Sequence, residues 1–118
     1  MWNEFPDQES TYEIDTQFMV GEAYLIVPKI NLPDIDATSD LPRWMVDFYL
    51  PEDELWYNEA TNLVDTATGF WRKSLLKNIE QLVFMRGGSI VPILQHEGCL
   101  ALLNCYQSDF SLKVYPDS

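Results

Sequence analysis

The chain has few basic residues, and this shortage already excludes two classes of partner. Seven lysines and arginines stand against nineteen aspartates and glutamates, which gives the 118 residues a formal net charge of -12. A surface of that sign repels phosphate backbones and anionic lipid headgroups. We therefore expect neither a nucleic acid nor a membrane among its partners.

Cysteine and histidine are also scarce, which argues against a metal site. The chain has two cysteines, Cys99 and Cys105, and one histidine, His96, and these residues show no zinc-ligand spacing. If both cysteines lie in one strand, about 3.3 Å per residue places them roughly 20 Å apart, too far for a disulfide bond. His96 has no accompanying nucleophile motif, so we interpret it as a surface residue. We expect free thiols, no metal and no cofactor.

Long hydrophobic runs are absent as well. No stretch approaches the about 20 consecutive apolar residues of a membrane-spanning helix. The opening residues, MWNEFPDQES, lack the basic start and apolar core of a secretory signal. We expect no anchor and no targeting segment in this sequence.

What the chain does have is 47% hydrophobic residues, enough for the core of one domain. From residue 44 onward they form short aromatic and β-branched segments separated by turn residues. These segments are 44–50, 55–58, 61–64, 69–76, 81–86, 89–94, 99–106 and 110–115. The pattern is typical of an antiparallel β-sandwich, so we predict a mainly β fold. A helix over residues 72–82 is the alternative for that stretch.

The N-terminal part has a different pattern. Residues 15–21, DTQFMVG, predict a short helical turn with an Asp or Thr cap, ended by glycine. The run AYLIVP, from Ala23 to Pro28, has the length of a strand. Its continuous apolar character predicts burial on both faces, as in a parallel sheet. Residues 29–43 contain two prolines and no hydrophobic period, which indicates a connection.

A glycine pair interrupts two apolar runs in LVFMRGGSIVPI, residues 82–93. Two glycines at this place predict a tight type I′ hairpin, because both central positions of that turn need positive φ. Arg86 would stand at its mouth, with Gly87 and Gly88 in the turn. A phosphate-binding loop would instead need a following Lys-Ser or Lys-Thr and a helix, and a strand is predicted there.

Carboxylates cluster in LPEDELWYNE, at Glu52, Asp53, Glu54 and Glu59. A glycosidase acid and base could come from such a set, but that pair needs rigid supports and one pKa raised by burial. A solvated acidic turn after a proline is the more economical interpretation. We therefore assign no catalytic residue in this chain.

Aromatic side chains offer two interpretations. The set comprises Trp44, Trp56 and Trp71 with Phe48, Tyr49 and Tyr57. These residues could form a stacking platform for sugar rings, but alternate aromatic positions on strands more often form a sandwich core. Trp2 differs because a proline-containing loop follows it directly, and it could line a cleft.

Five stretches in order resemble the catalytic chains of glycoside hydrolase family 31 α-glucosidases. They are an "EFP" loop, a "D-x-QF-x-x-G" turn, an apolar final barrel strand, a "VxxYLP…WY" segment and an "RGGxIxP" segment. The matching residues are Glu4, Phe5, Pro6, Ile14, Asp15, Gln17, Phe18, Gly21, Leu25, Val27, Pro28, Val46, Tyr49, Leu50, Pro51, Trp56, Tyr57, Arg86, Gly87, Gly88, Ile90 and Pro92. The resemblance covers nearly the whole chain.

The resemblance implies a division of the chain. Residues 1–30 would end a (β/α)8 barrel, 31–43 would be a linker, 44–95 a proximal β-sandwich and 96–118 the start of a distal β domain. The fold class expected is thus an antiparallel β-sandwich preceded by a terminal barrel strand or two. Family members hydrolyse terminal α-linked glucose with retention, without a cofactor, by two aspartates on earlier strands that this chain lacks.

The chain is accordingly expected to be structural support for a catalytic barrel and inactive alone. The strand from Ala23 to Pro28 would need cover from the rest of the barrel or from another protein chain. The α-glucoside would bind only the parent enzyme, with Trp2 and Glu4 as the expected substrate-rim residues. The resemblance implies a secretory or lysosome-like compartment. The competing hypothesis is a non-catalytic β-rich interaction module within a larger assembly.

Overall fold

The computed structural model describes residues 1–30, 34–35, 42–76, 81–94 and 109–117, with the backbone alone for 34–35 and 42–44. The first element is a short 3-10 helix, η1 (Glu9–Thr11), inside an N-terminal loop. It is the only helix in the described part of the chain. No helix there is long and apolar enough to span a bilayer.

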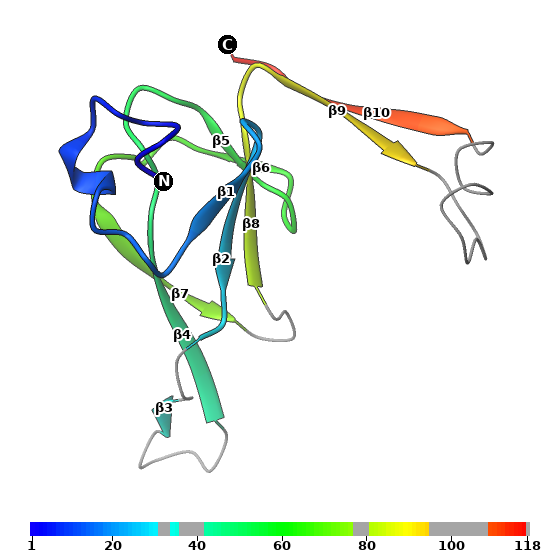
Figure 1. The fold of residues 1–118 in the computed structure, drawn as a ribbon. Coiled ribbons are helices and arrows are strands. Elements are labelled where there is room, and N and C mark those ends of the chain that lie inside the picture. The colour runs from blue at the N-terminus through cyan, green and yellow to red at the C-terminus, as the bar shows by residue number, and fades with distance from the viewer. Residues whose placement is uncertain (31–33, 36–41, 77–80, 95–108, 118) are drawn as a thin grey trace, which may run out of the picture.

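Three antiparallel sheets follow from the described strands (Figure 1). The strands are β1 (Phe18–Val20), β2 (Tyr24–Pro28), β3 (Asp34–Ile35), β4 (Pro42–Tyr49), β5 (Trp56–Asn58), β6 (Leu63–Asp65), β7 (Trp71–Leu76), β8 (Gln81–Arg86), β9 (Ser89–Leu94) and β10 (Phe110–Tyr115). A five-stranded sheet has the order β1-β2-β8-β5-β6, and a three-stranded sheet has the order β3-β4-β7. Strands β9 and β10 form a separate two-stranded sheet.

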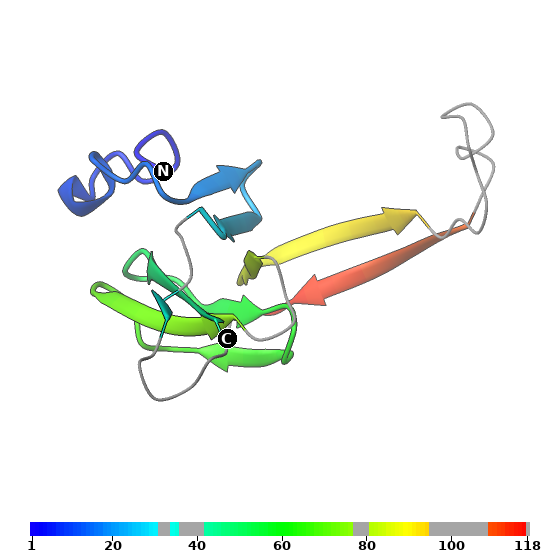
Figure 2. The same cartoon turned by 90° about the horizontal axis from the view of Figure 1, so that it is seen from below.

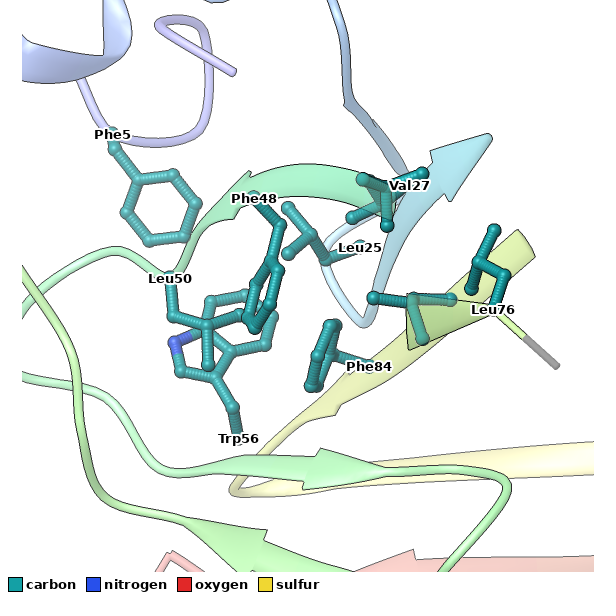
Figure 3. Close-up of a cluster of buried hydrophobic side chains, with 10 residues drawn as sticks. Phe5, Leu25, Val27, Phe48, Leu50, Trp56, Leu76 and Phe84 are labelled. Atoms are coloured by element: carbon teal, nitrogen blue, oxygen red, sulfur yellow. The ribbon is translucent and has the colours of Figure 1, made fainter. Parts of the chain in front are cut away.

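The five-stranded and three-stranded sheets enclose one core (Figure 3). Alternate residues of β2, β4 and β8 point into it, as the period of two in a strand requires. The buried cluster consists of Phe5, Leu25, Val27, Val46, Phe48, Leu50, Trp56, Leu76, Leu82 and Phe84. Phe48 of one sheet stacks on Phe84 of the other with ring centroids 5.2 Å apart. This arrangement confirms the predicted antiparallel β-sandwich.

The predicted segments between residues 44 and 115 coincide closely with β4 to β10. The predicted segment 99–106 lies outside the described residues, as do Cys99, Cys105 and His96. The alternative helix over residues 72–82 is wrong, because β7 continues to Leu76 and β8 begins at Gln81. In β7 exposure alternates residue by residue, which is the signature of a strand with one buried face.

The N-terminal prediction needs two corrections. The expected helical turn is a strand, β1, which pairs with β2 after a turn containing Gly21 (φ +60°). The strand ending at Pro28 is present, but it pairs antiparallel with β1 and β8 and buries mainly one face. Its short connection to β1 forces this direction, because a parallel partner would need a long crossover.

The predicted hairpin at Gly87 and Gly88 is also wrong. Among the described residues β8 pairs with β2 and β5, whereas β9 pairs with β10. Only Gly88 has positive φ (+78°), so the turn is not of type I′. The chain leaves the body here, and β9 and β10 extend away from it as a two-stranded arm (Figure 2).

The predicted domain limits stay predictions. Most of the proposed linker 31–43 and the proposed limit at residue 95 fall on residues outside the described part. Within the described part, Phe5, Leu25 and Val27 share one core with the sandwich strands. The strand β2 thus belongs to the sandwich sheet, and the described residues show no barrel.

Candidate functional site

The N-terminal loop carries the two predicted rim residues and is fixed at one buried point. Phe5 packs in the core with its ring centroid 6.1 Å from that of Trp56. The buried hydroxyl of Thr11 donates to the carbonyls of Phe5 (3.2 Å) and Gln8 (2.8 Å). The loop is therefore a folded unit of the sandwich.

Trp2 and Glu4 lie in different surroundings on this loop. Trp2 is 61% exposed and lines an open pocket of about 460 Å³ with Pro6 and Tyr12. Glu4 is half-buried, and its charge acts on the guanidinium of Arg86. The pocket beside Trp2 does not include Glu4, so their shared role at a substrate rim stays a prediction.

Arg86 connects three parts of the chain. Its Nη2 forms an ion pair with Glu54, and its guanidinium lies 5.1 Å from the centre of the Phe5 ring. Its backbone N–H donates to the carbonyl of Ala23 at 2.8 Å. The hydrogen bond to Glu54, with the charges of Glu54, Glu4 and Glu22, raises the pKa of Arg86 above its ordinary value. The arginine therefore stays charged and links the N-terminal loop, the segment before β5 and the turn before β2.

The two glycines complete this junction. The N–H of Gly87 donates to the carbonyl of Leu55 at 2.7 Å. A Cβ on Gly87 would lie 3.0 Å from Leu55 Cβ and 3.0 Å from the Pro116 carbonyl, so the close approach requires glycine. The N–H of Gly88 donates to the carbonyl of Tyr115 at 2.7 Å. The Arg-Gly-Gly segment thus joins the sandwich to the arm.

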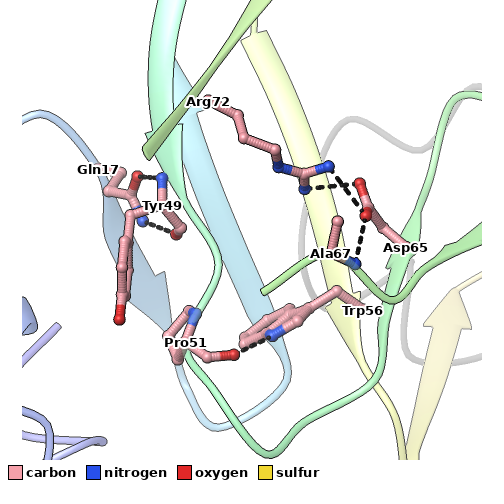
Figure 4. A network of polar contacts seen from close by, with 7 residues as sticks. All are labelled: Gln17, Tyr49, Pro51, Trp56, Asp65, Ala67 and Arg72. Carbon is pink, nitrogen blue, oxygen red and sulfur yellow. Dashed lines mark hydrogen bonds and ion pairs between the residues drawn. The ribbon is translucent and has the colours of Figure 1, made fainter. Parts of the chain in front are cut away.

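Two glutamines hold the end of β4 and the segment after it, a role that the sequence did not predict for either residue. The amide of Gln17 donates to the Tyr49 carbonyl (2.7 Å) and accepts from the Tyr49 N–H (2.8 Å) (Figure 4). Gln8 makes the same double contact with the backbone of Glu52, at 3.1 and 3.0 Å. A side-chain amide has the donor and acceptor of a peptide group, so each glutamine imitates a strand partner. Gln17 is buried, whereas Gln8 is half-buried.

A second set of contacts joins β5 to the segment after β4, and β6 to β7. The indole N–H of Trp56 donates to the carbonyl of Pro51 at 3.1 Å. Asp65 accepts two hydrogen bonds from Arg72, at 3.0 and 2.7 Å, and also accepts one from the Ala67 N–H (Figure 4). The Arg72 guanidinium lies 4.7 Å from the centre of the Phe48 ring. These polar residues are paired supports of the fold.

The acidic residues of LPEDELWYNE do not form a catalytic pair in the described structure. Glu54 is bound to Arg86, and Glu59 is bound to Lys113 at 3.1 Å. Asp53 is exposed with φ +62°, and Glu52 is exposed. No group of three or more metal-ligating side chains occurs among the described residues.

The prediction that the aromatic residues form the sandwich core is confirmed for three of the six. Trp56, Phe48 and Tyr49 are buried, as a core role requires. Trp71 is 51% exposed, so it does not belong to the core. Tyr57 is half-buried and donates from its hydroxyl to the Pro116 carbonyl at 2.7 Å. The side chain of Trp44 lies outside the described part.

Known proteins resemble the chain in both sequence and structure. The sequence profile described as "Glycosyl hydrolase family 31 C-terminal domain" matches residues 1–91. A neutral alpha-glucosidase C of Mus musculus is 29% identical over 99 residues, covering 79% of this chain and 9% of its own length. A probable alpha/beta-glucosidase of Aspergillus oryzae is 31% identical over 115 residues, covering 95% of this chain and 12% of its own length.

A solved structure of the same family also resembles the chain. The crystal structure of a GH31 alpha-xylosidase from a soil metagenome, complexed with xylose, aligns with a TM-score of 0.56 and 25% identity. The alignment covers 75% of this chain and 12% of that chain. The chain thus spans about a tenth of the length of these relatives. Because the family profile covers most of the sequence, the chain belongs to glycoside hydrolase family 31 and corresponds to its C-terminal domain.

Proposed function

We propose that this chain supports the catalytic barrel of an α-glucosidase-like enzyme and has no hydrolytic activity of its own. The enzyme would hydrolyse terminal α-linked glucose with retention of configuration. The relatives named as glucosidases support the substrate class. The chain spans only 9% and 12% of the length of two of these relatives, which supports a role as one part of a larger enzyme.

The outer face of the five-stranded sheet is the observation that carries this proposal. Tyr24 and Ile26 of β2 lie opposite Val20 and Phe18 of β1, so all four side chains share the face away from the core. Phe18 is 47% and Val20 is 52% exposed. An apolar face of this kind is typical of a surface that packs on another layer.

That layer would be the remainder of the barrel or another protein chain. The inner face of β2 is already filled, because Leu25 and Val27 are almost completely buried in the sandwich. The outer face is the one available for a partner. The Gln17 and Arg86 contacts would keep this face in one orientation relative to the sandwich.

The chemistry of the described residues supports the lack of activity. A retaining glycosidase needs two carboxyl groups about 5 Å apart, one of them kept protonated. Glu54 and Glu59 are each engaged in an ion pair with a basic side chain, so neither carboxylate faces a second carboxylate as such a pair requires. The reacting carboxylates would come from the barrel, with Trp2 and Glu4 at the rim of the assembled pocket.

A chimera tests the proposal. In the Aspergillus oryzae relative, this chain would replace the segment that it matches. We expect the chimera to hydrolyse an aryl α-glucoside, and the chain alone to show no turnover above buffer. Turnover by the chain alone, abolished by changing one of its acidic residues, would contradict the inactive-support role. A folded but inactive chimera would contradict the supporting role.

A further inference from the structure

A second pocket is lined by residues other than those of the Arg86 junction and has no role in the function proposed above. It has a volume of about 410 Å³ and lies where the residues before β1, the end of β2 and the strands β4 and β7 meet. Its lining residues are Glu13, Asp15, Thr16, Pro28, Ile30, Val46, Asp47 and Trp71. This volume is within the range of about 300–1,000 Å³ that is usual for small-molecule sites.

One wall of the pocket is an exposed indole on a rigid support. Trp71 begins β7 and lies directly opposite Tyr49 of β4. The two ring centroids are 5.9 Å apart. Tyr49 is itself fixed through its backbone by the buried amide of Gln17. A large aromatic surface that is half exposed, yet held in place, loses little conformational entropy when a ligand stacks on it.

The polar groups of the pocket are mainly carboxylates. Glu13, Asp15 and Asp47 contribute to the lining, and no lysine or arginine does so among the described lining residues. Lys73 approaches Asp47 to 3.8 Å, but both side chains are more than half exposed, so this pair is weak. Ionised carboxylates are acceptors only. A ligand for this pocket must therefore bring hydrogen-bond donors.

We infer that this pocket binds one or two pyranose units of a short α-glucan. A pyranose has one apolar face for the Trp71 ring and hydroxyl donors for Asp15 and Asp47. Pro28, Ile30 and Val46 supply the apolar wall that such pockets need. The inference rests on the proposed glycosidase role, which selects a glucan among hydroxyl-rich ligands.

Titration of maltotriose into the 118-residue chain, followed by the indole N–H signals in NMR spectra, tests the inference. The expected result is a shift of the Trp71 signal, with a dissociation constant on the order of 1 mM. Trp71→Ala should weaken binding at least tenfold, Asp47→Asn should weaken it severalfold, and Trp71→Phe should keep part of it. Dispersed spectra of the variants would show that they are folded.

Trp2→Ala is the matched control, because Trp2 lines a different pocket, with Pro6 and Tyr12. It should leave the affinity for maltotriose unchanged. Sorbitol, which has hydroxyls but no flat ring face, should not bind. Because the ligand is neutral, the affinity should change little when salt rises from about 0.05 to about 0.5 M.

Three results would overturn the inference. The first is an unshifted Trp71 indole signal at high maltotriose concentration, and the second is an unchanged affinity for maltotriose in Trp71→Ala. The third is salt-sensitive binding of tetramethylammonium without binding of maltotriose, which would identify a site for organic cations. This assay needs no turnover. An active chimera with no maltotriose binding would therefore refute the sugar site alone, and binding with an inactive chimera would refute the supporting role alone.

Discussion

At the scale of single residues, the buried side-chain amide of Gln17 forms backbone contacts that the sequence pattern does not reveal. Among the described residues Tyr49, at the end of β4, has no strand partner on the side away from β7, and Gln17 supplies the missing donor and acceptor. Glutamine is usually an exposed residue. Its burial here is explained by this double contact, because a buried peptide group without partners is costly.

Gln17→Ala should lower the free energy of unfolding by about 2–4 kcal/mol, because it leaves the N–H and the C=O of Tyr49 without partners in a buried place. Urea denaturation measures this loss. Gln8→Ala is the control, because it removes the same double contact at Glu52, where the contact is exposed. Water can replace it there, so the loss should stay below about 1 kcal/mol. Equal losses in the two variants would contradict the role of burial.

At the scale of elements, the end of β10 is fastened to the body by contacts of Tyr115 and its neighbours. The Tyr115 ring lies 5.3 Å from the Tyr57 ring, and the Tyr115 carbonyl accepts from Gly88. Further along the arm, β10 places Phe110, Leu112 and Val114 on one exposed apolar face. A two-stranded sheet is marginal alone, so the docked end stabilises the arm.

This docking should weaken at high pH. Burial raises the pKa of the Tyr115 phenol, and the hydrogen bond to Glu59 raises the pKa of the Lys113 ammonium. Both shifts favour the protonated forms in the folded chain. The unfolded chain loses these protons first, near its ordinary pKa values of about 10, so stability falls as the pH rises from about 9 to about 11.

Urea denaturation at several pH values measures this effect, and Tyr115→Phe should make the decline shallower. Lys113 is well exposed, so its share of the decline should be small. An unchanged slope in Tyr115→Phe would show that the phenol does not contribute to the pH dependence.

At the scale of the whole molecule, the described part of the chain has a well-buried sandwich core but exposes apolar side chains on its outer surfaces. The core between the two sheets is well filled, with Leu25, Leu50 and Trp56 fully buried. The outer face around β1 and β2, and the apolar face of the arm, expose aliphatic and aromatic side chains. A part of a larger assembly has this distribution, because its surfaces are completed by its neighbours.

Val20→Lys should reduce self-association of the isolated chain without lowering its free energy of unfolding by more than about 0.5 kcal/mol, because Val20 is an exposed edge-strand residue. Sedimentation velocity measures the association. Leu63→Lys is the matched control, since it adds the same charge at an exposed leucine on the far edge of the sheet. An equal effect in the control would attribute the change to net charge and not to the β1–β2 face.

Much of the fold could be predicted from the sequence, because strands and turns depend on residue preferences over short stretches. Short aromatic and β-branched runs between turn residues indicated the strands from β4 onward. The ordered stretches around Glu4, Gln17 and Arg86 indicated the family. The local pattern failed at residues 18–20, where pairing with β2 overrides a short helical signal.

Only the tertiary structure decided which strands pair and what the marked residues contact. The Arg-Gly-Gly segment was predicted to form a hairpin, but it is a junction, and this role depends on Leu55, Tyr115 and Glu54, which are distant in sequence. The exposure of Trp71 also depends on packing that no local pattern contains. Local sequence determined where strands and turns occur, because backbone preferences act over a few residues. Long-range contacts determined the pairing, the burial and the candidate sites, because only the folded core brings those residues together.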